Sequence, residues 1–282
     1  MRINPNRPFL LEREEALKLI AVDLDGTLLT SSNTLTNFTK STLIDACKKG
    51  HKLVIITGRD FYASNFIADM LEFEKYGGLV SSSNGGHVYS PKDKKVIISH
   101  MIDQDLAKEM IAYGKDLGFD FIIYNEGEIL SDKEESYGID FLAKKNKMPI
   151  RIVKDLDKKI DFSVNKVLFT ADPKVIEKNK DKIAQKFAGK INPIHAMPQF
   201  LDCMPPGINK GRSIIEIADY YGIDHKDTYA FGDEINDIEM IKMAGVGVAM
   251  GNANTYIKEI ADKIALSNDE DGIAHFVREN IL

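Results

Sequence analysis

The chain of 282 residues has little cysteine: its two cysteines, Cys47 and Cys203, lie far apart and outside any Cys-x-x-Cys pattern. We therefore expect neither a disulfide framework nor a zinc site. Long basic runs are missing as well, because 37 Lys and Arg residues are outnumbered by 43 Asp and Glu residues, which gives a formal charge of -6. A nucleic-acid partner is therefore not expected.

Long apolar runs are also missing near the N-terminus. The short stretch FLL is interrupted by Glu12 and Arg13, so the sequence predicts neither a secretory signal nor a membrane span of about 20 apolar residues. Together with the low cysteine content, this favours a cytoplasmic location. The first sixteen or so residues combine Pro, Asn and charge, and we expect them to form a loosely held arm.

The 44% hydrophobic content is enough for a sizeable core. Short β-branched runs at 17–23 and 52–57 read as buried strands, and helical spacing lies between them. The same alternation returns from 211 to the C-terminus. It predicts an α/β fold, a Rossmann-like doubly wound parallel sheet with helices on both faces.

The middle of the chain has a different pattern. Between 87 and 197, strand-like runs are set among strongly charged helical stretches. We interpret this segment as an inserted α+β domain. The core would then be discontinuous, formed by 1–86 and 198–282.

Four polar clusters are predicted to lie at strand ends or helix starts of the core. They are Asp23-Leu24-Asp25-Gly26-Thr27, Thr57-Gly58-Arg59, Asn209-Lys210-Gly211 and Gly232-Asp233-Glu234-Ile235-Asn236-Asp237. In an open parallel sheet, ligands bind outside the carboxyl ends of the strands. We expect the clusters to meet at that edge.

The carboxylates in these clusters would repel one another if nothing lay between them. Mg²⁺ prefers oxygen ligands and is typically held by one or two carboxylates and a substrate phosphate. The pattern therefore predicts a site for Mg²⁺ and a phosphate.

The segments DLDGT, ITGR, NKG and GDEIND, in this order and with a large insert between the second and third, resemble the haloacid dehalogenase superfamily. SNGG and AMGNA add a similarity to its Cof-type phosphatases, which carry a large α+β cap at that insertion point. The resemblance implies a Mg²⁺-dependent phosphatase that acts on a small phosphorylated metabolite through an aspartyl-phosphate intermediate.

The resemblance also implies a role for each matching residue. Asp23 would be the nucleophile, and Asp25 would protonate the leaving alcohol and then activate water. The phosphate would be held by Thr57, Gly58, Lys210 and Asn236. The metal site would include Asp23, Asp233 and the backbone carbonyl of Asp25. Asp237 would belong to the same site and would orient metal-bound water or Lys210.

Purely structural uses of some of these residues stay open. Asp233 and Asp237 would also suit a helix start, where carboxylates are favourable. Arg59 is as compatible with a structural ion pair as with a phosphate contact, and it is left out of the catalytic set.

Substrate choice is expected to lie in the cap, where Asn125, Glu126 and Glu128 are candidate contacts and a solvated loop is the alternative. Sugar phosphates are the first expectation, and pyridoxal phosphate and nucleotide monophosphates remain open. Two other functions also remain: phosphoryl transfer of the sugar-phosphate mutase type, and a catalytically weak regulator that binds a small molecule. The sequence gives no indication of the oligomeric state.

Overall fold

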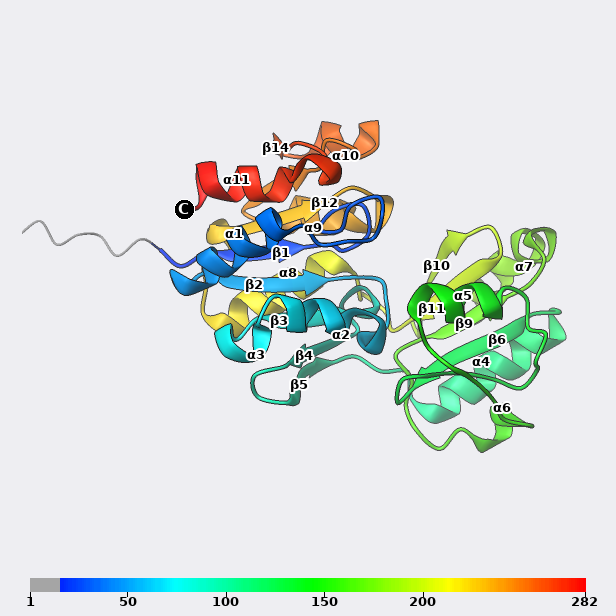
Figure 1. Ribbon diagram of the computed structural model, residues 1–282. Helices are drawn as coiled ribbons and strands as arrows, with labels where there is room; N and C mark the ends of the chain where they lie inside the picture. The colour runs from blue at the N-terminus through cyan, green and yellow to red at the C-terminus, as the bar shows by residue number, and fades with distance from the viewer. Residues whose placement is uncertain (1–15) are drawn as a thin grey trace, which may run out of the picture.

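The computed structural model describes residues 16–282. Two lobes are visible in Figure 1, a core formed by both ends of the described chain and a cap formed by its middle. The N-terminal arm expected from the sequence lies almost wholly outside the described residues.

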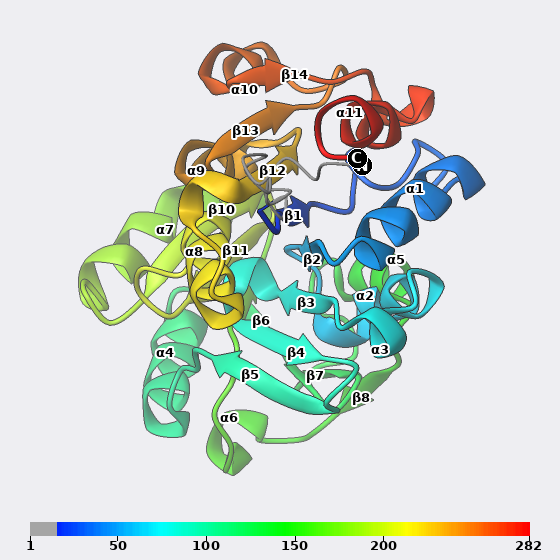
Figure 2. The same ribbon diagram turned by 90° about the vertical axis from the view of Figure 1, so that its left-hand side faces the viewer.

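The core is built on an eight-stranded sheet. Its strand order is β14-β13-β12-β1-β2-β3-β4-β5, and all neighbours are parallel except the β3–β4 and β4–β5 pairs, which are antiparallel. Figure 2 shows β1 in the middle of this sheet, between β12 and β2. The strands are β1 (Leu19–Val22), β2 (Lys52–Ile56), β3 (Leu79–Ser82), β4 (His87–Ser90), β5 (Lys95–Ser99), β12 (Thr228–Gly232), β13 (Val246–Ala249) and β14 (Lys263–Ile264).

The central strand β1 is buried on both faces. Because successive side chains of a strand point to opposite sides, Ile20 and Val22 pack against one layer of helices while Leu19 and Ala21 pack against the other. The first layer contains α1 (Asn37–Lys48), α2 (Phe61–Met70) and α11 (Gly272–Asn280), and the second contains α8 (Lys210–Tyr221) and α9 (Ile238–Met243). The short helices α3 (Phe73–Tyr76) and α10 (Thr255–Ile260) complete the core.

Side-chain caps fix where several core helices begin. The hydroxyl of Thr36 accepts a hydrogen bond at the start of α1, and the Asp60 carboxylate does so at the start of α2. At α8 the Asn209 side chain accepts from the backbone N–H of Arg212. Asn, Asp and Thr are preferred at these positions because they satisfy free N–H groups of the first turn. Because Asn209 is the N-cap residue of α8, Lys210 is the first residue of that helix.

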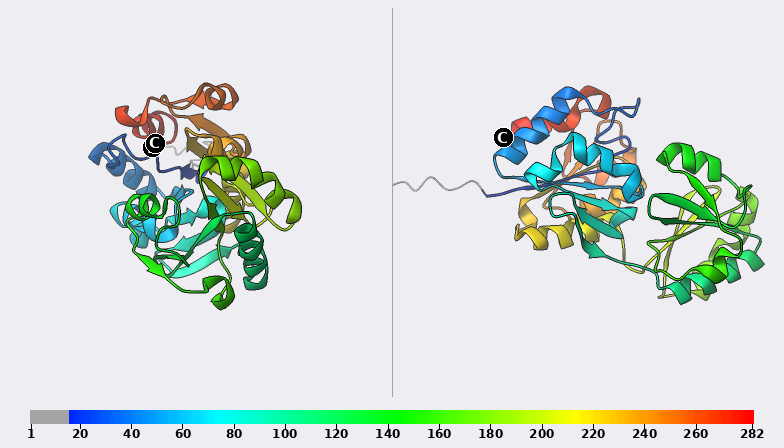
Figure 3. Two further views of the ribbon diagram at one scale, coloured as in Figure 1. Left: turned by 90° about the vertical axis from the view of Figure 1, so that its right-hand side faces the viewer. Right: turned by 60° about the horizontal axis from the view of Figure 1, so that its bottom comes forward.

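The cap lobe is built on a six-stranded sheet of order β10-β11-β9-β6-β7-β8. Helices α4 and α7 pack on one face of this sheet, and α5 packs on the other. Figure 3 shows the cap as a separate lobe beside the core. Its elements are α4 (Gln104–Asp116), β6 (Asp120–Asn125), β7 (Glu128–Ser131), α5 (Ile139–Asn146), β8 (Ile150–Ile152), α6 (Leu156–Lys159), β9 (Val167–Thr170), α7 (Pro173–Lys186), β10 (Asn192–Met197) and β11 (Phe200–Met204).

The predicted fold class is confirmed: a doubly wound, largely parallel sheet carries an inserted α+β cap. The limits of 87 and 197 for the insert need correction, however. Strands β4 and β5 extend the core sheet, and β11 belongs to the cap sheet, so the chain enters and leaves the cap later than the sequence suggested. Antiparallel strands at a sheet edge are joined by a short turn and need no connecting helix. In the sequence, their apolar residues therefore look the same whether the strands belong to the core sheet or to the cap sheet.

Among residues 16–282, no helix is both long enough and apolar enough to cross a membrane.

Candidate active site

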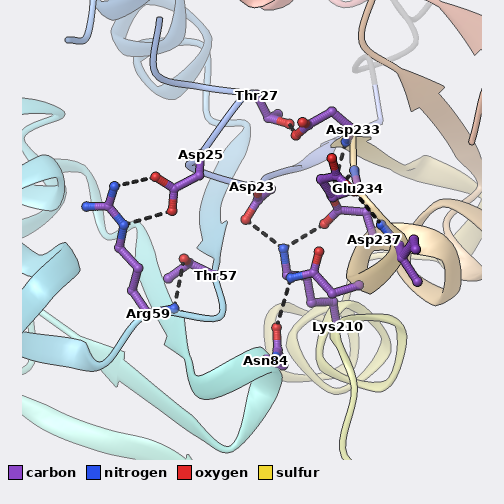
Figure 4. A network of polar contacts seen from close by, with 12 residues as sticks. Asp23, Asp25, Thr27, Thr57, Arg59, Asn84, Lys210, Asp233, Glu234 and Asp237 are labelled. Carbon is purple, nitrogen blue, oxygen red and sulfur yellow. Dashed lines mark hydrogen bonds and ion pairs between the residues drawn. The ribbon is translucent and has the colours of Figure 1, made fainter. Parts of the chain in front are cut away.

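Polar side chains gather where four core strands end, at the edge that faces the cap. Asp23 follows β1, Thr57 follows β2, Asn84 follows β3, and Asp233 follows β12. Figure 4 shows these residues around Lys210, which reaches them from the first turn of α8. The carboxyl ends of parallel strands share one edge, so the convergence expected from the sequence is present.

The ammonium group of Lys210 lies between two carboxylates. Its Nζ atom donates hydrogen bonds to Asp23 Oδ1 and Asp237 Oδ1, each at 2.6 Å. Lys210 and Asp237 are fully buried and Asp23 is 5% exposed. Burial alone would lower the pKa of Lys210, but the charges of Asp23 and Asp237 outweigh burial and raise it. Lys210 is therefore held as a cation in the centre of the site.

Asp237 and Asp233 are fixed by the turn that follows β12. Asp237 Oδ2 accepts hydrogen bonds from the backbone N–H groups of Asp233 and Glu234, both at 3.0 Å. Thr27 Oγ1 donates to Asp233 Oδ1 at 2.6 Å. Asp237 also closes the capping box of the short helix at 235–237, so the structural use considered for it from the sequence is present together with the contact to Lys210.

Gly26 lets the loop after β1 come close to Asp233. Its φ angle is +77°, and a Cβ atom at this position would lie 2.3 Å from Asp233 Oδ2. A larger residue would be strained in this backbone conformation and would also displace the carboxylate. The glycine of the DLDGT segment is therefore required by the geometry of the site.

The three acids Asp23, Asp233 and Asp237 form a group that could hold a metal ion. One carboxylate oxygen from each lies within 4.8 Å of the others. Burial raises the pKa of Asp23 to about 7, with a further rise from the Asp237 charge and an opposing effect of Lys210. Burial also raises the pKa of Asp233 to about 6.

Burial is the main cause of these raised pKa values, and the charge of Asp237 adds to it, since three carboxylates are grouped around one ammonium. Uncompensated charge is costly inside a protein. A hard divalent cation with oxygen ligands would remove the excess of negative charge, so the residues present fit the predicted Mg²⁺.

Asp25 does not join this group through its side chain. Its carboxylate turns to Arg59, which donates from Nε to Oδ2 at 2.9 Å and from Nη2 to Oδ1. Of the four acids assigned to the metal, only Asp23, Asp233 and Asp237 therefore place their carboxylates together. Asp25 could contribute only its backbone carbonyl. Arg59, left out of the catalytic set, holds Asp25 in a bidentate ion pair.

The Asp25 carboxylate is accessible and charged. Its side chain is 41% exposed and lines the same cavity as Asp23. Burial raises its pKa, but the hydrogen bond and charge of Arg59 have the larger combined effect, so the pKa lies below the ordinary value of 3.8.

We expect Arg59→Gln to raise the pKa of Asp25, because the bidentate cation is lost. If Asp25 acts as the base that activates water in the second half of turnover, the acid limb of the profile of kcat against pH will move to higher pH. The same profile should not move in Arg278→Gln, which changes an arginine on the remote helix α11. An unmoved acid limb in Arg59→Gln would show that Asp25 does not set it.

A second group of polar residues lines the same cavity. The backbone N–H of Asn84 donates to the carbonyl of Thr57 at 2.8 Å, and Asn236 Nδ2 donates to Asn84 Oδ1 at 3.3 Å. A Cβ atom on Gly58 would lie 3.1 Å from Asn84 Oδ1. Thr57, Gly58 and Asn236 thus meet as expected. Asn84 was not assigned a role, although the SNGG segment was noted.

The site opens into a cavity of about 590 Å³ between core and cap. On the cap side its walls include Tyr124, Lys166, Leu168, Phe200 and Asp202. Within the described part of the chain, the lining does not include the three candidate cap contacts, Asn125, Glu126 and Glu128, which agrees with the alternative of a solvated loop. Glu128 instead pairs with Arg151 at 2.6 Å, and Glu126 lies in the β6–β7 turn.

The fold and the site define a hydrolase with a discontinuous α/β core and an inserted cap. A family model for haloacid dehalogenase-like hydrolases matches residues 20–277. The chain therefore belongs to the haloacid dehalogenase-like hydrolase family.

Several curated relatives are named as phosphatases or putative phosphatases. The chain is 30% identical over 271 residues to the 5-amino-6-(5-phospho-D-ribitylamino)uracil phosphatase YitU of Bacillus subtilis, with 93% of this chain and 96% of that protein covered. It is 29% identical over 269 residues to a putative phosphatase of Streptococcus pyogenes, with 95% and 99% covered.

Solved structures agree with this assignment. A haloacid dehalogenase-like hydrolase from Bacteroides thetaiotaomicron is 32% identical and has a TM-score of 0.87, with 93% of this chain and 99% of that chain covered. A sugar phosphatase of subclass IIB is 25% identical and has a TM-score of 0.74, with 93% and 98% covered. The protein is a phosphatase of the Cof type, as the motifs indicate.

Proposed function

We propose that the protein removes phosphate from a small phosphorylated metabolite, most readily a sugar phosphate, in a Mg²⁺-dependent reaction through a phosphoryl group on Asp23. The observation that carries the proposal is the position of Asp23. Its buried carboxylate is hydrogen-bonded to Lys210 and opens into the same cavity as the accessible Asp25.

In the first step, a carboxylate oxygen of Asp23 forms a bond to the substrate phosphorus. The bond from phosphorus to the alcohol oxygen breaks, and Asp25, which must carry a proton at the start of this step, gives that proton to the oxygen. Lys210 and Thr57, with the N–H groups of the turn at Gly58, hold the transferring oxygens. Positioning and charge neutralisation supply most of the catalysis of phosphoryl transfer.

In the second step, Asp25 accepts a proton from a water molecule as that water attacks the phosphorus. The bond from phosphorus to Asp23 breaks, so inorganic phosphate leaves and the carboxylate returns. Arg59 supports this role because it stabilises the carboxylate that Asp25 becomes once it has given its proton to the leaving alcohol. The covalent route replaces one difficult displacement with two easier ones.

The metal would be held by Asp23, Asp233 and the backbone carbonyl of Asp25. Asp237 would orient these groups without binding the metal directly, because its oxygens already accept hydrogen bonds from Lys210 and from two backbone N–H groups. When bound, Mg²⁺ supplies positive charge to the phosphate and to the crowded carboxylates.

A small substrate is favoured because the cap covers the cavity. An enclosed site excludes bulky phosphoproteins and keeps bulk water from the reaction. The names of two relatives, a ribityl phosphate phosphatase and a sugar phosphatase, also support a polyol or sugar phosphate as the substrate.

Phosphate release should be measured with sugar phosphates, pyridoxal phosphate and nucleotide monophosphates, each with Mg²⁺ and with excess EDTA. We expect release with Mg²⁺ and a loss of at least about a hundredfold with EDTA, because the acids would then repel both one another and the phosphate. Release that EDTA leaves unchanged would contradict the metal requirement. Interconversion of hexose 1- and 6-phosphates without net release would favour the mutase.

A further inference from the structure

A buried ion pair lies in the cap wall of the cavity, opposite the catalytic acids. Lys166 Nζ lies 3.1 Å from Asp202 Oδ1, and the two side chains are only 8% and 14% exposed. Lys166 also lies over the ring of Tyr124, with 5.3 Å from Nζ to the ring centroid. None of these three residues takes part in the phosphoryl transfer proposed above.

The cap sheet presents these residues to the core. On β6, Ile123 packs on the face covered by α4 and α7, and the next residue, Tyr124, therefore points to the other face. On β11, Leu201 and Cys203 pack with the helices while Phe200 faces the core side, which places Asp202 on that side as well. Lys166 precedes β9 and lines the same cavity.

The ion pair leaves hydrogen-bonding capacity unused. Within the described residues, the buried Asp202 Oδ1 atom has no polar partner apart from its 3.1 Å contact with Lys166 Nζ. An ammonium group has three N–H donors. Burying an ion pair is often no more stabilising than an apolar replacement of similar volume, so stability alone does not account for this pair beside the cavity.

The charges around the pair do not favour an anion. Asp202 is close to Lys166, and the carboxylate of Asp60 faces Lys166 from the core across the cavity. One ammonium is thus shared by two carboxylates, and a second phosphate placed against Lys166 would find no surplus positive charge there; Lys145, which also lines the cavity, lies near Asp25 instead. An alkyl group would leave the donors of Lys166 and the acceptor Asp202 without partners, which is also unfavourable.

We propose that Lys166, Asp202 and Tyr124 form the site that recognises the leaving group, and that this group is uncharged and carries several hydroxyls, as in a sugar or polyol. Lys166 donates to one hydroxyl oxygen and Asp202 accepts from a neighbouring O–H. The apolar side chains of Leu168 and Phe200 beside them cover the C–H face of the same group. This inference rests on the proposed phosphatase function.

The test compares three substrates of matched chain length: sorbitol 6-phosphate, n-hexyl phosphate and fructose 1,6-bisphosphate. Sites built to hydrogen-bond a hydroxyl strongly reject analogues that lack it. We expect kcat/KM of the wild-type protein for sorbitol 6-phosphate to exceed that for n-hexyl phosphate by at least about a hundredfold, and to exceed that for the bisphosphate.

Lys166→Met and Asp202→Asn should each reduce the preference for sorbitol 6-phosphate over n-hexyl phosphate by at least about tenfold, mainly through KM. The exposed cap lysine changed in Lys182→Met is the matched control and should keep the wild-type preference. The double variant Lys166→Met with Asp202→Asn removes both charges; we expect it to regain the thermal stability lost in Lys166→Met without regaining the preference.

The inference would be overturned, while the phosphatase function stands, by n-hexyl phosphate turned over as well as sorbitol 6-phosphate, by a preference for the bisphosphate, or by an equal loss on both substrates in the variants. Restoration of the preference in the double variant would likewise show a purely structural role. If the wild-type protein released phosphate from none of the compounds in either panel, the proposed function itself would fail, and the inference with it.

Discussion

Asp23→Asn is expected to lower phosphate release by at least about a thousandfold, because an amide cannot act as the nucleophile. The change keeps the side-chain volume, and Lys210 retains its contact with Asp237. The fold should therefore persist. Steady-state kinetics with the preferred substrate, together with circular dichroism, would measure both properties.

The matched control for this variant is Asp45→Asn, which changes an exposed acid on α1 that pairs with Lys48. It should turn over substrate at the wild-type rate. Near-normal turnover by a folded Asp23→Asn protein would rule out the covalent route.

Lys210→Met is expected to reduce turnover by about a hundredfold or more and also to destabilise the fold. The methionine fills a similar space, but Asp23 and the fully buried Asp237 lose their shared cation. Removing one partner of a buried ion pair typically costs about 3–5 kcal/mol of unfolding free energy. Urea unfolding in EDTA and steady-state kinetics in Mg²⁺ would measure the two effects.

Stability and catalysis can be separated with Lys210→Met combined with Asp237→Asn. This double variant removes one of the stranded charges, so it should be more stable than Lys210→Met and remain as inactive. A Lys210→Met protein that unfolds like the wild type would contradict the electrostatic picture of the site. Recovery of activity in the double variant would contradict the catalytic role of Lys210.

The convergence of the site could be predicted because it follows from chain topology. Asp23, Thr57 and Asp233 each come directly after a strand of one parallel sheet, and such ends must meet at one edge. Lys210 could be predicted from its place in the ordered motifs. The N-cap residue Asn209 starts α8 at Lys210, and this position lets the lysine side chain reach the acids.

Other features could not be predicted, because they depend on side-chain direction or on tertiary packing. Nothing in the spacing of Asp25 and Arg59 indicates that the two form a bidentate pair, since the contact arises only when β1 and β2 lie side by side. Lys166 and Asp202 are ordinary charged residues in a charged segment. Their burial follows from the pairing of β9 with β11, which no local pattern encodes.

The most direct test of the account is to trap the phosphoryl group during turnover. The reaction would be quenched in acid and reduced with borohydride, which converts an aspartyl phosphate to homoserine, and the peptides would be sequenced by mass spectrometry. The account predicts homoserine at position 23 in the wild-type protein, and none in Asp23→Asn. Active enzyme that yields no modified residue, or a modification at any other acid, would contradict it.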